Sequence, residues 1–375
     1  MRVGHLTLLH GYNYGGMLQA WATQEILRSH GHEVITLDYH PARRMQLLRR
    51  ACLNFRPLFQ PLASFSDKLN FSGVDQFNAF RARHFTFSKT CSDIRTLERA
   101  CRDFDAVVVG SDQVWSPDWI RAPYFVDFDL PSSCRRVSLA ACCGRPCEDP
   151  EYRAFVARTL SRFNQISVRN EFTADLVRQT TGKEPAIVCD PTLATEVPAH
   201  PVPGISGPYI LAYIINRKHS IPLATEALLK LKRQIGLPVY SIPPAELKGQ
   251  CGLPADRILG PITPFQWNHL IANASWLVTD SFHGTIFALK NHRNFTAISS
   301  GFKTAGRLGA ILSATGLTDQ MVTTIPEGDL SSIVPETWLA SDSHLFGESR
   351  GYHEFLAESL ATASSNEQNQ QSRGI

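Results

Sequence analysis

The sequence lacks any long hydrophobic run. Hydrophobic residues make up 43% of its 375 positions and charged residues 19%, which is the composition of an ordinary globular protein. No stretch approaches the roughly 18 apolar residues that a membrane-spanning helix needs. The apolar run in the opening residues, MRVGHLTLLHGYNYGG, is too short for a secretory signal, and no cleavage site follows it. We therefore expect a cytoplasmic protein.

The signatures of common cofactor and metal enzymes are also absent. There is no GxGxxG, no GxxxxGKS/T and no HExxH, which argues against nicotinamide enzymes, P-loop nucleotidases and zinc proteases. The nine cysteines are scattered apart from Cys142, Cys143 and Cys147, whose spacing does not fit a zinc ribbon. The net charge of +3 is too small to indicate nucleic-acid binding. We expect no metal, no cofactor, no structural disulfide and no nucleic-acid partner.

Strands and helices alternate along the chain. A predicted strand at 3–9, a helix at 17–31 and a strand at 32–39 form a unit that favours a parallel sheet covered by helices. Further strands are predicted at 104–110, 135–144, 165–170 and 186–193, and then at 209–215, 237–243, 275–280 and 294–299. Further helices are predicted at 150–163, 221–235, 263–274 and about 304–316. The sequence thus predicts an α/β protein with two Rossmann-like domains that face a cleft.

Length and composition set the predicted domain boundaries. A chain of 375 residues suits two domains of about 150 residues each. The Pro- and Gly-rich stretch at 198–208 separates an N-terminal Rossmann-like domain at 1–197, with a helical basic insert at 41–104, from a C-terminal one at 198–360. Residues 361–375 are polar, and we expect them to form a disordered tail.

The insert contains a basic amphipathic segment at 43–56. Its sequence, RRMQLLRRACLNFR, has five arginines and no acid, interleaved with apolar side chains. Such a segment can lie on an anionic membrane surface or hold an anionic acceptor, although an ordinary solvated helix face is the alternative. Peripheral contact with the inner membrane surface is therefore one expectation for this segment.

Polar loops follow several of the predicted strands. They contain NYGG (13–16), GSDQVW (110–115), SVRN (167–170) and TDSFHG (279–284). Ligands of parallel α/β sheets bind at the carboxyl ends of the strands, which is where these loops would lie. Four polar loops at one cleft are more than packing needs, so they are the candidate site.

His283 is the first candidate in these loops. It lies in the first turn of a predicted helix, where unpaired N–H groups and the helix dipole favour an anion. With Ser281, Gly284 and Thr285 beside it, His283 can donate to a phosphate or carboxylate, or move a proton at a reacting centre. A histidine that merely caps the strand-to-helix turn is the alternative.

The other candidates lie in the first half of the chain. Arg169 can make a two-pronged contact with a carboxylate or phosphate, or can pair with a surface acid such as Glu171. Asp112 can act as a general base or cap the following turn. We also expect substrate contacts from Gln113, from the flat face of Trp115, and from Asn13, Tyr14 and Gly15, where a helix starts close to the cleft.

Five of these strings occur together in one order. They are NYGGMLQAWATQ (13–24), FDAVVVGSDQVW (104–115), SVRNEFT (167–173), CDPTL (189–193) and VTDSFHGTIFAL (278–289). In this order and spacing the chain resembles the polysaccharide pyruvyl transferase family over about residues 1–355. The resemblance implies a GT-B-like fold, with the acceptor on the N-terminal side and the donor on the C-terminal side.

The resemblance also implies an activity. It is the transfer of a pyruvyl group from phosphoenolpyruvate to a sugar of a cell-surface polysaccharide or a lipid-linked glycan precursor, as a ketal, with release of phosphate. His283 would be the acid or the phosphate anchor, Arg169 the clamp on the donor anion and Arg307 a second basic contact. In place of residues frequent in the family this chain has Ser281, Asn170 and Cys142, so the charge partners of the donor stay open.

Two other functions remain open at this point. A nucleotide-sugar glycosyltransferase would use the same cleft and would bind a nucleoside diphosphate. A non-catalytic relative would keep the fold for binding or scaffolding, and loss of His283 or Arg169 would be its mark, yet both are present. The acceptor sugar, the hydroxyls that are bridged and the oligomeric state are not predicted.

Overall fold

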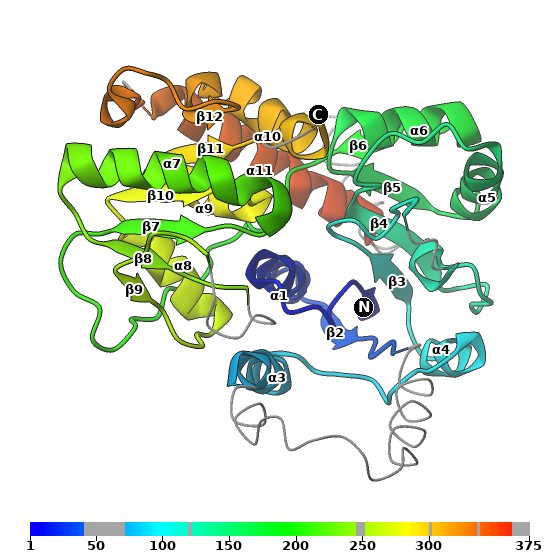
Figure 1. Ribbon diagram of the computed structural model, residues 1–375. Coiled ribbons are helices and arrows are strands. Elements are labelled where there is room, and N and C mark those ends of the chain that lie inside the picture. The colour runs from blue at the N-terminus through cyan, green and yellow to red at the C-terminus, as the bar shows by residue number, and fades with distance from the viewer. Residues whose placement is uncertain (41–71, 119–121, 245–251, 300–301, 336–337, 362–375) are drawn as a thin grey trace, which may run out of the picture.

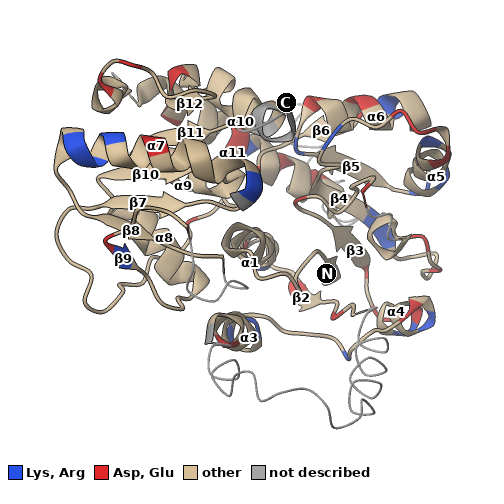
Figure 2. Cartoon of the chain, viewed as in Figure 1, with Lys and Arg blue, Asp and Glu red and all other residues tan. Residues whose placement is uncertain are grey.

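The computed structural model describes residues 1–40, 72–118, 122–244, 252–299, 302–335 and 338–361. The basic segment at 43–56 and the tail beyond 361 lie outside these residues. In the described part of the chain, no helix is both long enough and apolar enough to cross a membrane. Figure 2 shows charged residues mainly on the helices and loops, while buried apolar residues fill the strands of both sheets.

The first sheet confirms the predicted parallel arrangement. Its order is β2-β1-β3-β4-β5-β6, and every neighbouring pair is parallel. The strands are β1 (Arg2–Leu6), β2 (Glu33–Thr36), β3 (Ala106–Val109), β4 (Arg135–Ala141), β5 (Gln165–Val168) and β6 (Ala186–Ile187). The apolar run AVVV of β3 is buried throughout, as expected for a strand covered on both faces.

Helices connect these strands. They are α1 (Tyr14–Ser29), α3 (Ser72–His84), α4 (Ile94–Ala100), α5 (Pro150–Leu160) and α6 (Glu171–Thr181), with a short 3₁₀ helix, η2 (Ala122–Phe125). Side chains cap several of them: Asn13 accepts a hydrogen bond from the N–H of Gly16, and Asn170 accepts one from that of Thr173. These caps fix where each helix starts relative to the strand before it.

The second sheet repeats this plan. Its order is β12-β11-β10-β7-β8-β9, again parallel throughout. The strands are β7 (Ile210–Tyr213), β8 (Val239–Ser241), β9 (Arg257–Ile258), β10 (Trp276–Thr279), β11 (Asn294–Ile298) and β12 (Met321–Val322). The helices are α7 (Arg217–Ile235), α8 (Pro264–Ala272), α9 (Phe282–Lys290), α10 (Phe302–Ala314) and α11 (Leu339–Ser359), with 3₁₀ helices η3 (Thr318–Gln320) and η4 (Leu330–Ser332). Thr263 caps α8 as predicted, in a capping box with Gln266.

Two helices join the sheets. α1 packs against the second sheet's side of the molecule, where Tyr14 stacks on Trp267 of α8 with ring centroids 5.9 Å apart. α11 runs from the second half back to the first sheet (Figure 1), and its Tyr352 and Leu356 join the core around Val3. The predicted boundary at residue 198 assigns α11 to the second unit, whereas its last turns pack on the first.

Candidate active site

Four charged or polar side chains meet where the strands of both sheets end. Asp112 follows β3, Arg169 follows β5, Asp190 follows β6 and His283 follows β10 at the start of α9. Carboxyl ends of parallel strands share one edge of a sheet, so residues distant in sequence come together here. Asp190 is not among the site residues expected from the sequence, although it directly follows the apolar run AIVC (186–189).

Arg169 lies at the centre of the cluster. Its Nη1 donates to Asp190 Oδ2 at 2.6 Å, and its Nη2 donates to Asp112 Oδ1 at 3.0 Å. The guanidinium carbon lies 4.8 Å from the centre of the Phe282 ring. Burial by itself lowers the pKa of Arg169, but the neighbouring Cys142, Asp112 and Asp190 raise it above the usual value, so the guanidinium stays charged.

The two-pronged contact predicted for Arg169 therefore joins two carboxylates. In the structure Arg169 pairs with acids, which was the alternative to a substrate contact. The acids are Asp112 and Asp190 rather than Glu171. Glu171 pairs with Arg178 instead, at 2.6 Å. A donor contact by Arg169 stays a prediction and would use its remaining N–H groups.

Asp190 is the buried acid of the cluster. Its Oδ1 accepts hydrogen bonds from the Thr192 N–H at 3.0 Å and hydroxyl at 2.7 Å. Its Oδ2 lies 2.6 Å from Arg169 and 3.3 Å from His283 Nε2. Burial alone would raise the pKa of Asp190, but His283 and Arg169 hold it well below the usual range, so the carboxylate is ionised.

His283 is held from two sides. On one side its Nε2 approaches Asp190 at 3.3 Å, without the alignment of a hydrogen bond. On the other side its ring lies directly against the backbone of Gly15, where an added Cβ would come within 2.2 Å of His283 Cγ. Only a glycine fits there. Gly15 thus lets α1 approach the histidine, rather than a ligand directly.

The turn before α9 is built by its own polar groups. Ser281 Oγ accepts a hydrogen bond from the Gly284 N–H at 3.1 Å, and Asp280 accepts from the N–H groups of Ile215 and Asn216 at 2.7 and 2.8 Å. Capping therefore accounts for Ser281 and Gly284, and their contact with a substrate stays a prediction. The Thr285 hydroxyl is buried and has no hydrogen-bond partner within the described residues.

The prediction that Trp115 offers a face to a sugar is wrong. The side chain is fully buried, stacks on Phe125 with centroids 5.8 Å apart, and donates from Nε1 to the carbonyl of Tyr124 at 2.9 Å. The chain turns this ring back into the core because Asp112, three residues earlier, has a left-handed backbone with φ of 59°. Tyr14 is likewise buried, in the aromatic packing with Trp267, so it is not available to a substrate.

Three candidates remain, and the structure shows no substrate-facing role for the side chains of the two that it describes. Asn13 is exposed, and its side chain caps α1. Gln113 is half-buried and its side chain lies beside Gly144. Arg307 lies in α10, one turn before Ala310 and Ile311, and its side chain is outside the described part of the structure.

A buried hydrogen-bond network fixes the turn that carries Asp112. Gln19 of α1 accepts from the Ser111 N–H at 3.1 Å, and it donates to the Thr7 hydroxyl at 3.1 Å and the Gly16 carbonyl at 3.0 Å. His5 Nε2 lies 3.1 Å from the Gly110 carbonyl, so this nitrogen carries the proton. Burial lowers the pKa of His5 to about 4, which keeps the ring neutral. One glutamine thus ties together the loop after β1, the start of α1 and the turn before Asp112.

The exposure of the four side chains separates their roles. The Asp112 side chain is 25% exposed, whereas those of Arg169, Asp190 and His283 are 3%, 0% and 7% exposed. Asp112 is therefore the carboxylate that an incoming molecule can touch most easily, and the buried residues hold it in place. The cluster can accept a proton at Asp112, and it holds the His283 ring beside the Asp190 carboxylate.

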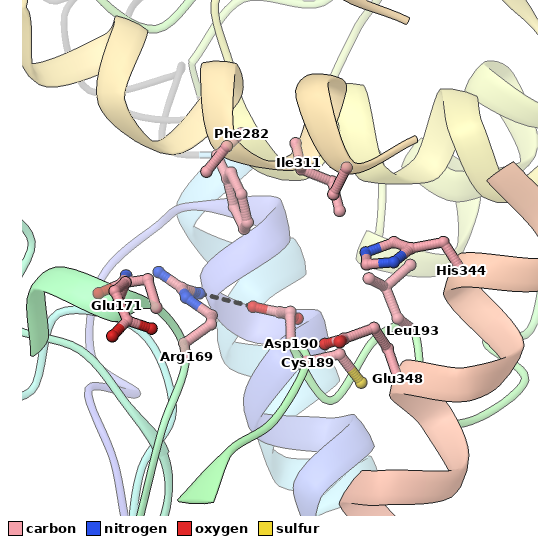
Figure 3. Close-up of a pocket in the computed structure, with 12 residues that line it drawn as sticks. Arg169, Glu171, Cys189, Asp190, Leu193, Phe282, Ile311, His344 and Glu348 are labelled. Atoms are coloured by element: carbon pink, nitrogen blue, oxygen red, sulfur yellow. Dashed lines mark hydrogen bonds and ion pairs between the residues drawn. The ribbon is translucent and has the colours of Figure 1, made fainter. Parts of the chain in front are cut away.

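A pocket adjoins the cluster. It has a volume of about 160 Å³ and is lined by residues of both halves, among them Arg169, Asp190, Phe282 and, from α11, His344 and Glu348. Figure 3 shows His344 and Glu348 projecting from α11 toward Asp190, with Phe282 and Ile311 on the opposite wall. The place of α11 at this site could not be predicted from the sequence, because the helix reaches the pocket only through long-range packing.

Comparisons with known proteins agree with this arrangement. The family model described as polysaccharide pyruvyl transferase matches residues 13–301. A UDP-N-acetylglucosamine 2-epimerase from Rickettsia bellii has a similar structure, with a TM-score of 0.51 and 11% identity over 98% of this chain and 97% of that chain. This likeness shows the fold alone: two Rossmann-like domains in a GT-B-like arrangement, as predicted.

Two further solved structures align over most of the chain. The glycosyltransferase SnogD from Streptomyces nogalater is 14% identical, with a TM-score of 0.43 over 95% of each chain. UGT89C1 from Arabidopsis thaliana is 10% identical, with a TM-score of 0.48 over 96% of this chain and 99% of that chain. No curated protein sequence matches the chain.

Proposed function

Because the chain belongs to the polysaccharide pyruvyl transferase family, we propose that it moves a pyruvyl group from phosphoenolpyruvate to a sugar of a cell-surface polysaccharide or a lipid-linked glycan precursor. The product is a ketal across two sugar hydroxyls, and phosphate is released. The observation that supports this most is the cluster of Asp112, Arg169, Asp190 and His283 at the meeting edge of the two sheets.

The proposed reaction needs one proton to be given and others to be accepted. A proton adds to the methylene carbon of phosphoenolpyruvate and makes an oxocarbenium-like centre at its middle carbon. Two sugar hydroxyls form C–O bonds to that carbon, and the bond to the phosphate oxygen breaks. Of the two hydroxyl protons, one balances the proton on the new methyl group and the other leaves with phosphate.

The side chains of the cluster suit these steps. Asp112 is the most exposed carboxylate of the cluster, and we assign it the proton of an attacking hydroxyl. His283 lies in the first turn of α9, where the helix dipole favours a phosphate, and its Nε2 lies 3.3 Å from Asp190. His283 is therefore the proposed acid or phosphate anchor. Arg169 donates hydrogen bonds to both Asp112 and Asp190 and so fixes their positions, and we assign it as one cation near the donor.

Binding of the donor is the first test. Phosphoenolpyruvate at about 100 times its dissociation constant stabilises a binding protein by roughly 2.7 kcal/mol, which is visible as a rise in melting temperature. We expect this rise in the wild type and its loss in His283→Ala. A rise with a nucleoside diphosphate or nucleotide sugar, and none with phosphoenolpyruvate, would favour the glycosyltransferase function instead.

Turnover is the second test. Incubation with phosphoenolpyruvate and a sugar acceptor should release phosphate, and the acceptor should gain the mass of one pyruvate less one water. Asp112→Asn should lower kcat by about 10²–10⁴-fold if Asp112 is the base. Donor binding without phosphate release for any acceptor would indicate a non-catalytic relative.

A further inference from the structure

Two polar side chains of α11 line the pocket. His344 and Glu348 are one helical turn apart, both half-buried, and both lie on the wall that holds Cys189 and Asp190. Within the described residues, neither makes a hydrogen bond or an ion pair. Both can therefore form hydrogen bonds to a ligand that enters the pocket.

The opposite wall of the pocket is apolar. Phe282 and Ile311 face the two polar side chains (Figure 3). Ala310 and Ala314, on the same helix as Ile311, also line the pocket. A ligand that fits must therefore present hydroxyl or amide groups on one side and C–H groups on the other. A sugar ring has these two faces.

The volume of about 160 Å³ is below the roughly 300–1,000 Å³ of pockets that enclose drug-sized ligands. The pocket therefore favours a small ligand, such as one monosaccharide ring, over a nucleotide or an oligosaccharide.

The charged residues of the pocket wall bear on whether it suits the sugar acceptor or phosphoenolpyruvate. Among the described lining residues, Glu171, Asp190 and Glu348 are acids and Arg169 is the one arginine. Glu348 also helps to raise the pKa of the buried Cys189 thiol, after burial and Asp190. Because Asp190 is paired with Arg169 and Glu171 with Arg178, Glu348 is the acid of this wall that has no ion pair within the described residues. Such a wall suits a neutral, hydroxyl-rich molecule better than a further anion.

We propose that this pocket binds the terminal monosaccharide ring of the acceptor, with Glu348 and His344 as hydrogen-bonding residues and Ile311 and Phe282 against its C–H face. The inference rests on the proposed function, which supplies a sugar acceptor. Arg169 lines the pocket and donates a hydrogen bond to Asp112, so a ring held here is separated from the proposed base by one side chain. The helix α11 is thereby a specificity element of the transferase.

The test is direct binding, which does not depend on turnover. Saturation-transfer NMR of the full chain is recorded with methyl glycosides of glucose, galactose, mannose and N-acetylglucosamine, each with and without phosphoenolpyruvate. We expect transfer to at least one glycoside in the wild type. Glu348→Gln should weaken that binding about ten-fold, because a hydrogen bond to a charged acceptor is lost. Glu354→Gln, on the same helix but outside the pocket, should leave it unchanged.

A second pair of variants fills the pocket without adding an aromatic face. Ala310→Leu and Ala314→Leu place apolar bulk on its wall at exposed positions of α10, where folding is tolerant of change. Both should abolish glycoside binding, whereas Ser313→Leu, which does not line the pocket, should not. Phosphoenolpyruvate binding, followed by the thermal shift, should survive in all three.

The outcomes are separable from those for the proposed function. No transfer to any glycoside in the wild type, or equal loss with Ser313→Leu, overturns the sugar subsite even if the enzyme is active. Loss of phosphoenolpyruvate binding in the leucine variants, with glycoside binding intact, makes the pocket a donor site and also overturns it. Glycoside binding that depends on the pocket, without pyruvyl transfer, supports the subsite and contradicts the proposed reaction.

Discussion

At the scale of single residues, the contact between Gly15 and His283 is the tightest constraint on the site. Gly15→Ala places a Cβ 2.2 Å from His283 Cγ, so either the ring or α1 has to shift. We expect a loss of about 1–3 kcal/mol in the free energy of unfolding, as for other overpacked sites. Gly16→Ala is the control, since its nearest neighbour there is 3.6 Å away. Urea unfolding of both variants measures the difference, and equal stabilities would show that His283 moves freely.

Asp190 gives a prediction for pH. Its pKa is depressed in the folded protein, so its contribution to stability is present above the unfolded value of about 3.9 and is lost as pH falls through the lower, folded value. Asp190→Asn should cost about 3–5 kcal/mol at pH 7, because Arg169 loses a buried partner. The difference in the free energy of unfolding between Asp190→Asn and the wild type should become smaller below about pH 4.

An exposed pair provides the comparison for Asp190. Asp118 pairs with Arg145 at 2.7 Å with both side chains more than a third exposed, so Asp118→Asn should cost about 0–1 kcal/mol. Chemical unfolding of the two variants between pH 3 and 7 measures both costs. A cost for Asp190→Asn as small as that for Asp118→Asn would mean that the buried cluster is not organised by this acid.

At the scale of elements, α1 positions the turn that carries Asp112 through Gln19. Gln19→Leu removes the hydrogen bonds to Ser111, Thr7 and Gly16, which frees the turn that carries Asp112. A displacement of about 1 Å at a reacting group can cost about 10²-fold in rate, so we expect a fall of this size in kcat with a smaller change in KM. Gln24→Leu removes a second, equally buried glutamine of α1 that bonds to His84 instead.

The control and a rescue distinguish positioning from stability. Both leucine variants should lose similar stability, but only Gln19→Leu should lose kcat. Gln19→Glu can restore the donor at low pH, where its buried carboxyl is protonated, so its activity relative to wild type should rise as pH falls. Equal kcat in Gln19→Leu and Gln24→Leu would assign Gln19 a structural role only.

The elements that could be predicted are those with a local pattern. Apolar runs such as AVVV in β3 specified buried strands, and the parallel order then placed Asp112, Arg169 and His283 at one edge. Asp190 was harder to recognise because its strand, β6, is only two residues long. The direction of Trp115 depends on a left-handed backbone at Asp112, and the approach of α11 depends on long-range packing; neither leaves a periodic signal in the sequence.

At the scale of the whole molecule, α1 and α11 hold the two sheets to each other. Tyr14 of α1 packs on Trp267 of α8, while Tyr352 and Leu356 of α11 reach the core of the first sheet. The cluster takes Asp112, Arg169 and Asp190 from the first half and His283 from the second. The geometry of this cluster therefore depends on how the two halves are held together.

At the same scale, the basic segment 43–56 predicts peripheral contact with an anionic membrane surface. Each arginine near an anionic surface contributes about 1 kcal/mol, so replacing Arg43, Arg44, Arg49 and Arg50 with Gln should greatly weaken sedimentation with phosphatidylserine vesicles. Binding should also fall as salt rises. Replacement of Arg153, Arg158, Arg162 and Arg178 of the α5–α6 region makes the same change in net charge and is the control. Equal weakening by both sets would indicate a general charge effect, and unchanged binding in the first would remove the membrane role from this segment.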